Sequence, residues 1–223
     1  MRPLTERWPK PLLPIDGRPV IATLLRELAL AGFESVTIVV GHLADRIEAL
    51  VGDGSGFALD VRYTDQPRAL GAGDAVRRAL AAGVRPPLVA TAADTVYAPG
   101  DVARACRAWL ASGAAGGLGV REVPPAEVDG RTAVTVESGW VTAIGGQAKR
   151  RRGSVVAAAP LWFLGPDLAS ALDAVPGPPH ELAAPFRAAI AAGAKILAVE
   201  LGPTRDVTTP HDVVLRNFPY LSR

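Results

Sequence analysis

The chain is poor in cysteine and in net charge. It has one cysteine, Cys106, among 223 residues. A single cysteine excludes an internal disulfide and fits a reducing compartment, and its place in a helical pattern indicates core packing. The 24 basic and 22 acidic residues leave a net charge of only +2, and the one basic cluster is short. This balance argues against a nucleic-acid-binding protein, because such proteins usually present a clustered basic face.

Long hydrophobic runs and a secretory leader are also missing. No apolar run is long enough to span a bilayer, and the proline-rich, charged N-terminus is unlike a signal peptide. Apolar residues still make up 49% of the chain, which is enough for a sizeable core. We therefore expect one soluble, cytoplasmic, globular domain over residues 1–223, without a membrane or nucleic-acid partner.

The hydrophobic pattern alternates between the periods of strands and helices. Buried strands are predicted at 35–40, 59–64, 87–94, 154–164 and 194–201. Helices are predicted at 19–32, 43–51, 71–83, 100–112, 166–174 and 180–192, and a last one after the cap Thr209. The segment 131–144 predicts a hairpin that turns at Ser138 and Gly139. This alternation predicts an α/β fold with a mostly parallel, doubly wound sheet.

Two aspartates stand where such a sheet binds ligands, beyond the carboxyl ends of its strands. Asp94 ends the strand predicted at 87–94, and Asp206 follows the strand at 194–201 after a short loop. Two carboxylates there can hold a hard cation such as Mg²⁺, which takes few protein ligands. The alternative is that each aspartate is a turn or cap residue.

A glycine-rich helix start lies after the second predicted strand. Gly71 and Gly73 leave the backbone N–H groups of that helix open to a ligand, although such starts are often only turns. Gln66, just before it, can read a base edge through its amide or be a solvated loop residue.

Lys10 stands between Pro9 and Pro11, which present it from a stiff, extended segment. A cation held in this way stabilises negative charge on a phosphoryl group in transfer. The alternative is a solvated loop lysine.

Four stretches together resemble a known family. "RPLTERWPKPLLPIDGRPVI" is similar to the signature of the sugar-phosphate nucleotidyltransferases, the nucleoside-diphosphate-sugar pyrophosphorylases. "QPRALGAGDAV" resembles their base-binding loop, "AADTVY" their metal site and "RDVTTPHDV" a later segment, all in order along nearly the whole chain. The resemblance implies a Rossmann-like (GT-A type) three-layer domain with a mostly parallel mixed sheet.

The resemblance also implies roles for individual residues. Lys10 matches the lysine that contacts the nucleotide phosphates and stabilises the transition state. Gln66 and Gly71 match positions that meet the nucleobase, and Asp94 and Asp206 match the aspartates that hold the catalytic Mg²⁺.

The sequence departs from the family pattern at several places. Ala93 replaces the glycine before the metal aspartate, and Arg205 stands where an aromatic-rich segment is common. The family's E-K-P motif is absent, so Lys149 is the nearest candidate to grip the sugar phosphate, with a solvated charge run as an equally good interpretation. Met1 falls inside the signature, so the G-x-G-T-R loop and the first strand are missing. We expect the chain as given to be inactive and marginally folded, or its natural start to lie upstream of Met1.

The implied reaction joins a nucleoside triphosphate to a sugar 1-phosphate and gives a nucleoside-diphosphate sugar and pyrophosphate. Guanosine transfer to mannose 1-phosphate and thymidine or uridine transfer to glucose 1-phosphate are all compatible with the sequence. One alternative is a catalytically silent relative that binds nucleotide or sugar nucleotide as a regulatory subunit. Another is a transferase with a non-sugar acceptor, such as choline phosphate or a molybdenum cofactor precursor. Homo-oligomerisation is left open.

Overall fold

The computed structural model describes residues 4–124, 131–145, 150–151, 154–206 and 209–218. The first half contains α1 (Leu4–Arg7), η1 (Lys10–Leu12), β1 (Pro14–Ile15), β2 (Arg18–Pro19), α2 (Val20–Leu30), β3 (Ser35–Val40), α3 (Ala44–Val51), η2 (Ser55–Phe57), β4 (Asp60–Asp65), α4 (Ala72–Ala81), β5 (Leu88–Thr91), β6 (Thr95–Val96) and α5 (Asp101–Ser112). The second half contains β7 (Gly116–Val123), β8 (Val134–Glu137), β9 (Trp140–Ile144), β10 (Arg150–Arg151), β11 (Ser154–Leu164), α6 (Pro166–Ser170), η4 (Ala171–Ala174), α7 (Ala183–Ala191), β12 (Ile196–Glu200), β13 (Arg205–Asp206) and α8 (Pro210–Asn217). No helix in the described ranges is long and apolar enough to cross a membrane.

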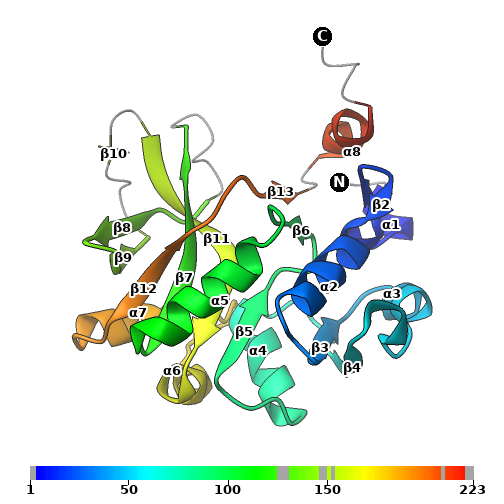
Figure 1. The fold of residues 1–223 in the computed structure, drawn as a ribbon. Coiled ribbons are helices and arrows are strands. Elements are labelled where there is room, and N and C mark those ends of the chain that lie inside the picture. Colours follow the sequence, from blue (N-terminus) through cyan, green and yellow to red (C-terminus); the bar gives the residue numbers. More distant parts are fainter. Residues whose placement is uncertain (1–3, 125–130, 146–149, 152–153, 207–208, 219–223) are drawn as a thin grey trace.

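A mixed sheet forms the centre of the molecule (Figure 1). Its strands follow the order β10–β11–β7–β12–β9–β8, and β5 also pairs with β11. Within it, β7 and β12 run parallel and the other pairs are antiparallel. A second sheet is the parallel pair β3–β4, with Ser35 opposite Asp60. The predicted α/β class with a mixed sheet is confirmed, but among the described strands only the pairs β7–β12 and β3–β4 are parallel.

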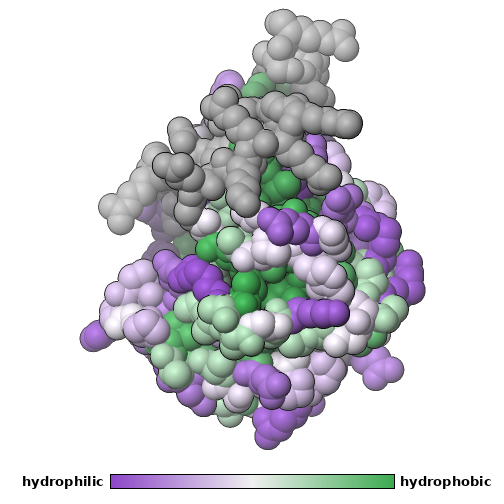
Figure 2. Space-filling model, turned by 90° about the vertical axis from the view of Figure 1, so that its left-hand side faces the viewer, coloured by the Kyte–Doolittle hydropathy of each residue, from purple (hydrophilic) through white to green (hydrophobic). Residues whose placement is uncertain are grey.

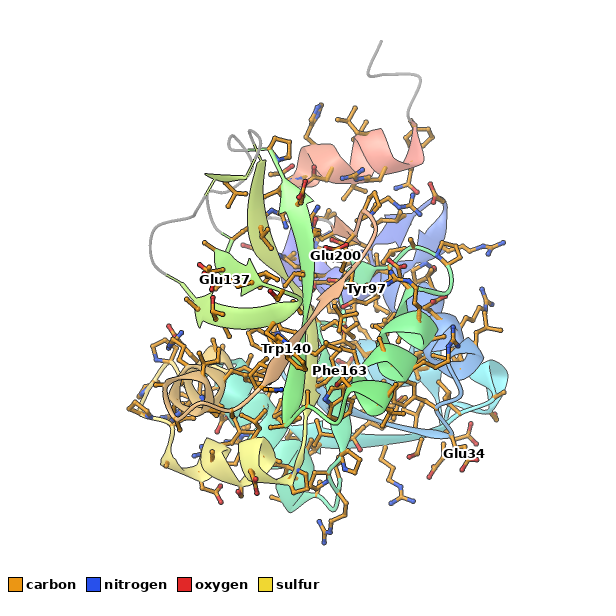
Figure 3. The ribbon with its side chains drawn as sticks, turned by 60° about the vertical axis from the view of Figure 1, so that its left-hand side comes forward. Glu34, Tyr97, Glu137, Trp140, Phe163 and Glu200 are labelled. Carbon is orange, nitrogen blue, oxygen red and sulfur yellow. The ribbon has the colours of Figure 1, made fainter. Side chains whose placement is uncertain are left out.

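One hydrophobic core joins the two sheets. It contains Ile38 and Val40 of β3, Leu161 and Phe163 of β11, and buried side chains of α2 and α5. Phe163, labelled in Figure 3, is fully buried. Its ring centroid lies 5.2 Å from that of Trp109 on α5. Because strands of both sheets share these contacts, helix α2 with its preceding segment is held at a fixed place against the central sheet.

Strand β7 is absent from the elements that the sequence predicts. Its glycines mask the strand pattern, because glycine is depleted in strands and marks turns. The tertiary structure explains them: a Cβ at Gly117 would lie 3.1 Å from the ring of Phe163, and one at Gly119 would lie 2.7 Å from Leu201. The small residues therefore let bulky neighbours pack against the strand that pairs with both β11 and β12.

Two local predictions are confirmed in detail. The hairpin β8–β9 turns at Ser138 and Gly139, both with positive φ, at 51° and 83°. Such a turn matches the twist of the paired strands.

Helix α8 begins with a capping box: the Asp212 N–H donates to the Thr209 hydroxyl at 3.2 Å, and the Thr209 N–H donates to the Asp212 carboxylate at 2.6 Å.

Candidate active site

Lys10 and Asp94 lie together in the fold. The Lys10 Nζ atom is 3.9 Å from Asp94 Oδ2, and the two side chains are 40% and 31% exposed. The lysine begins the short helical turn η1, in which the Leu13 N–H donates to the Lys10 carbonyl at 3.0 Å. The prediction of an extended segment is therefore correct for Pro9, with φ −63° and ψ 142°, and wrong for Lys10 itself. Pro11 fits the turn because a helix start needs no N–H there.

The two aspartates of the predicted metal site reach the same edge by different routes. Strand β5 ends at Thr91, earlier than predicted, so Asp94 lies in the turn before β6. Strand β13 pairs antiparallel with β6 and places Asp206 opposite Thr95, the residue next to Asp94. Both carboxylates are partly exposed. Two accessible carboxylates suit Mg²⁺, which keeps most of its water and substrate oxygens as ligands.

No group of three or more His, Cys, Asp or Glu side chains that could hold a metal ion occurs in the ranges that the structure describes. The described residues therefore contain no metal site that is formed by three or more of these side chains. The donor set at Asp94 and Asp206 fits a magnesium ion that is completed by substrate.

The C-terminal helix holds the segment that bears Lys10. The Asn217 side chain of α8 donates to the Pro14 carbonyl at 2.9 Å and accepts from the Gly17 N–H at 2.7 Å. Arg205 of β13 donates to Asp16 at 2.6 Å in the same turn. Helix α8 and strand β13 are thus tied to the turn that follows Lys10 in the chain.

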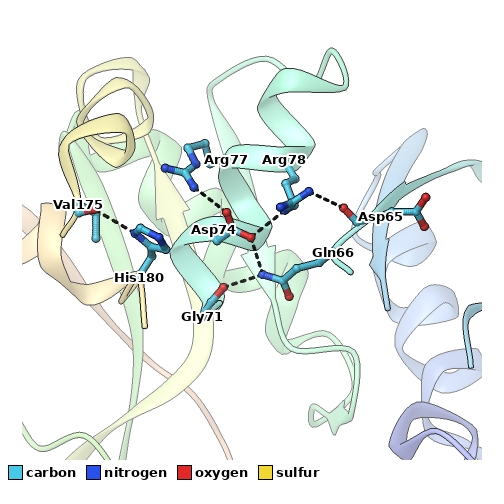
Figure 4. A network of polar contacts seen from close by, with 8 residues as sticks. All are labelled: Asp65, Gln66, Gly71, Asp74, Arg77, Arg78, Val175 and His180. Atoms are coloured by element: carbon cyan, nitrogen blue, oxygen red, sulfur yellow. Dashed lines mark hydrogen bonds and ion pairs between the residues drawn. The ribbon is translucent and has the colours of Figure 1, made fainter. Parts of the chain in front are cut away.

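Gln66 lies in a dense polar network at the start of α4 (Figure 4). Its Nε2 group donates to the Gly71 carbonyl at 3.0 Å and to Asp74 Oδ2 at 2.9 Å. Asp74 is only 1% exposed and also accepts from Arg77 at 2.6 Å and from Arg78 at 2.7 Å. Hydrogen bonds from Gln66 first, then from the two arginines, hold the pKa of Asp74 well below its ordinary value. The carboxylate is therefore ionised at neutral pH.

The helix start at Gly71 is approached by the chain itself. Gly71 has φ 105°, and a Cβ there would collide with the backbone carbonyl of His180. The Gly73 N–H donates to that carbonyl at 2.9 Å, and the His180 N–H donates to the Leu70 carbonyl at 2.7 Å. The His180 ring is fixed through Nδ1, 3.0 Å from the Val175 carbonyl. The predicted glycine helix start is confirmed, but part of its bare backbone binds residue 180.

The sequence analysis overlooks Asp74 and His180. The spacing of Asp74 to Arg77 and Arg78, three and four residues on, is a signal that could have shown the buried ion pairs. No local pattern points to His180, because its backbone partners Leu70 and Gly73 lie more than a hundred residues earlier.

A cavity of about 310 Å³ opens near the carboxyl ends of β7 and β12. Its lining mixes apolar and charged side chains: Val120, Arg121, Glu122, Val136, Val156, Glu200, Leu201, Gly202 and Pro203. Figure 2 shows the molecule from the side of β8 and β9, where apolar surface gathers near the middle and polar surface surrounds it. Lys149, the candidate for the sugar phosphate, lies outside the described residues.

The family of the chain follows from comparison with known proteins. A family model for the MobA-like NTP transferase domain matches residues 4–177. The chain belongs to this family. Its predicted membership of the nucleotidyltransferases is thereby confirmed.

Curated relatives of this MobA-like NTP transferase domain match over short stretches. The N-acetylmuramate alpha-1-phosphate uridylyltransferase of Neisseria meningitidis is 42% identical over 67 residues, which is 30% of this chain and 29% of that protein. The glucose-1-phosphate thymidylyltransferase of Streptomyces griseus is 45% identical over 71 residues, 32% of this chain and 20% of that protein. These matches thus span less than a third of the relatives they match.

Solved structures agree with the domain over its full length. A UDP-glucose pyrophosphorylase complexed with UDP-glucose has a TM-score of 0.79 at 18% identity, covering 100% of this chain and 94% of that one. A putative glucose-1-phosphate thymidylyltransferase from Bacillus anthracis has a TM-score of 0.81 at 15% identity, covering 97% and 88%. At such identities the likeness establishes the fold.

Proposed function

We propose that this domain transfers a nucleoside monophosphate from a nucleoside triphosphate to a sugar 1-phosphate. The observation that carries the proposal is the meeting of Lys10 and Asp94 at 3.9 Å, with Asp206 on the strand paired to β6. A partly exposed cation beside the Asp94 carboxylate, with Asp206 on the neighbouring strand, suits phosphoryl transfer, because the reaction depends on positioning and charge neutralisation. The names of the curated relatives, uridylyl- and thymidylyltransferases of sugar phosphates among them, support the choice of acceptor.

The reaction needs no covalent enzyme intermediate. A phosphate oxygen of the sugar 1-phosphate attacks the α-phosphorus of the triphosphate in line, and the bond to the bridging oxygen breaks. Pyrophosphate leaves with that electron pair. Lys10 binds the phosphate oxygens on which negative charge accumulates. Asp94 and Asp206 would hold Mg²⁺, which neutralises phosphate charge when it is bound.

The remaining predicted residues divide between donor and acceptor substrate. We assign Gln66 and Gly71 to the nucleobase, since both lie at the start of α4 and the Gln66 amide is fixed by its bond to the Gly71 carbonyl. We assign the cavity at the ends of β7 and β12 to the sugar phosphate, because ligands bind at this edge of α/β sheets. A cytoplasmic location, homo-oligomerisation and the absence of nucleic-acid and membrane partners stay predictions.

The test is a pyrophosphate-release assay with Mg²⁺ on the full-length protein. It crosses five common nucleoside triphosphates with a panel of sugar 1-phosphates and choline phosphate. We expect turnover with at least one pair and loss of it with chelator or in D94N. The matched control is D167N, which makes the same chemical change at an exposed aspartate of α6. Nucleotide binding without turnover for every pair would contradict the proposal and favour the catalytically silent relative. Turnover only with choline phosphate or another non-sugar acceptor would show that the acceptor is not a sugar 1-phosphate.

A further inference from the structure

Asp101 is a buried acidic residue that the proposed reaction does not use. It is the first residue of α5 and is only 8% exposed. Its Oδ1 atom accepts from the Arg104 side chain at 2.6 Å. Its Oδ2 atom accepts from the Gly202 N–H at 2.7 Å, across 101 positions of the sequence. A buried carboxylate with two short, charge-assisted bonds is held in one orientation, so it can fix the backbone to which it binds.

Arg104 holds the same piece of chain at a second point. Its Nη1 group donates to the Glu200 carbonyl at 2.9 Å, while its Nη2 group binds Asp101. Glu200 is the last residue of β12, and Gly202 follows it by two residues. The start of α5 therefore binds both a carbonyl and an N–H of the segment that leaves the central sheet.

The bonded residues lie on the two segments that carry the proposed magnesium ligands. One segment carries Asp94 and, seven residues later, Asp101. The other carries Gly202 and, four residues later, Asp206. The pairing of β6 with β13 joins the segments at one end, because Asp206 lies opposite Thr95 (Figure 1). The bond from Gly202 to Asp101 joins them at the other end. The two cross-links close a ring and limit how far Asp94 and Asp206 can move apart.

The contact between the segments leaves little room for adjustment. A Cβ at Gly202 would lie 3.2 Å from Asp101 Oδ2 and 3.3 Å from the Cβ of Ala98. The Gly100 N–H, just before Asp101, also donates to the Glu27 carboxylate of α2 at 2.7 Å. The close contact with residue 202 and the bond to α2 together fix the position of the start of α5.

We propose that Asp101 is a positioning residue that sets the separation of the Asp94 and Asp206 carboxylates for a divalent cation. The inference rests on the proposed function, which assigns Mg²⁺ to these two side chains. Mg²⁺ requires near-ideal octahedral geometry, so a site with two protein carboxylates depends on their separation. Within the described ranges the three aspartates do not form a group of three potential ligands. Asp101 therefore acts through the Gly202 backbone.

The experiment measures divalent-cation binding to the full-length protein and to D101N, with Mn²⁺ as the probe and electron paramagnetic resonance as the readout. Asparagine has the size of aspartate, but one of its two ends is an NH₂ group, which cannot accept from Arg104 or Gly202. We expect the dissociation constant for Mn²⁺ to rise by about tenfold or more, as is typical when a residue that orients metal ligands is changed. The Mg²⁺ concentration for half-maximal turnover should rise in parallel, with kcat at saturating Mg²⁺ largely retained.

D101E separates positioning from charge. Glutamate keeps the negative charge but carries its carboxylate one methylene farther, so it cannot make both bonds in the present geometry. We expect D101E to weaken Mn²⁺ binding as D101N does. Wild-type affinity in D101E together with weakened binding in D101N would show that Asp101 acts through its charge, and would overturn the positioning role.

Two controls separate the effect from the loss of an ion pair and from a loss of stability. D60N makes the same chemical change in an exposed pair on β4, where Asp60 binds Arg62 at 3.0 Å. V51A removes buried methyl groups at the end of α3, outside both segments, and lowers stability. We expect both variants to bind Mn²⁺ with wild-type affinity, while thermal unfolding reports the stability of each. An equal loss of binding in V51A and D101N would overturn the inference.

G202A keeps the inference falsifiable if D101N does not fold. Its added Cβ must displace Asp101 Oδ2 or the segment by a few tenths of an ångström. We expect a rise in the Mn²⁺ dissociation constant that is smaller than in D101N. The matched control is G56A, where nothing lies within 4 Å of the added Cβ. Wild-type affinity in G202A would overturn the inference.

Hydrogen exchange tests the bond itself in the wild-type protein. The Gly202 amide proton should exchange slowly with solvent, and faster in D101N. Fast exchange in the wild type, or unchanged Mn²⁺ affinity in a folded D101N, would overturn the inference while leaving the proposed function intact. A wild-type protein that binds no Mn²⁺ and shows no turnover with any nucleotide would instead refute the proposed function.

Discussion

Two predicted parts of the site are built in opposite ways. At one, Lys10 and Asp94 are both partly exposed, and their charged atoms are 3.9 Å apart. At the other, the buried Asp74 accepts from Gln66, Arg77 and Arg78 at 2.6 to 2.9 Å. The Lys10–Asp94 pair leaves its charges accessible to a ligand. The charge of Asp74 is neutralised by bonds within the protein.

The difference indicates a division of labour. Groups that must exchange partners during phosphoryl transfer gain from weak mutual pairing, since substrate oxygens and a metal ion then compete easily. A group such as Asp74, which only orients the Gln66 side chain, is more effective when it is buried and strongly bonded. Every alternative orientation of the side chain then costs free energy. The following predictions test this comparison.

The largest expected effect is on turnover in D94N. Removing the charge should lower kcat by about 10²–10³-fold, the scale seen when a preorganised electrostatic group is removed. The midpoint of thermal unfolding should hardly change, because the side chain is 31% exposed and its ion pair is loose. A large loss of stability with retained turnover would show that Asp94 is structural.

The next largest effect is on the stability of G71A. The variant places a Cβ against the His180 carbonyl and strains a residue with φ 105°. The matched control is G83A, where φ is 107° and nothing lies within 4 Å of the added Cβ. The strain at positive φ, about 1–3 kcal/mol, is common to both. Urea unfolding should show G71A to be less stable than G83A by about 2 kcal/mol. Equal losses would mean that the segment of His180 does not press on the helix start.

A smaller effect is expected in the pH dependence of stability. The folded pKa of Asp74 is lowered, so the stability it provides is present above its unfolded value near 4 and is lost as pH falls through the folded value. D74N lacks this titrating group. Its free energy of unfolding should therefore fall less steeply than that of the wild type below about pH 4, as measured by urea unfolding at several pH values. Parallel acid profiles would contradict the lowered pKa.

The smallest effect is on the stability of K10Q. An ion pair between partly exposed groups contributes about 0–1 kcal/mol, so the free energy of unfolding should change by less than about 1 kcal/mol. Turnover should still fall strongly, because the lysine cation is lost from the transition state. A loss of several kcal/mol in urea unfolding would show that the Lys10 pair is as structural as the Asp74 network.

Much of the fold could be predicted because its signals are local. The Ser138–Gly139 turn and the Thr209 cap depend on neighbouring residues alone, and both are confirmed. Strand β7 could not be predicted, because its glycines make room for Phe163 and Leu201, which are distant in sequence. The turn at Lys10 could not be predicted either, since the prolines permit both an extended and a turned backbone.

The sequence by itself determined the alternation of elements, the family and the identity of Lys10, Gln66, Gly71, Asp94 and Asp206 as candidates. Only the tertiary structure decided which of them meet. The pairing of β13 with β6 brings Asp206 beside Asp94, and the packing of residue 180 on α4 closes the helix start. The physical reason is that hydrophobic periodicity and turn chemistry act over a few residues. Strand pairing and burial join residues from opposite halves of the chain, as Thr95 and Asp206 show.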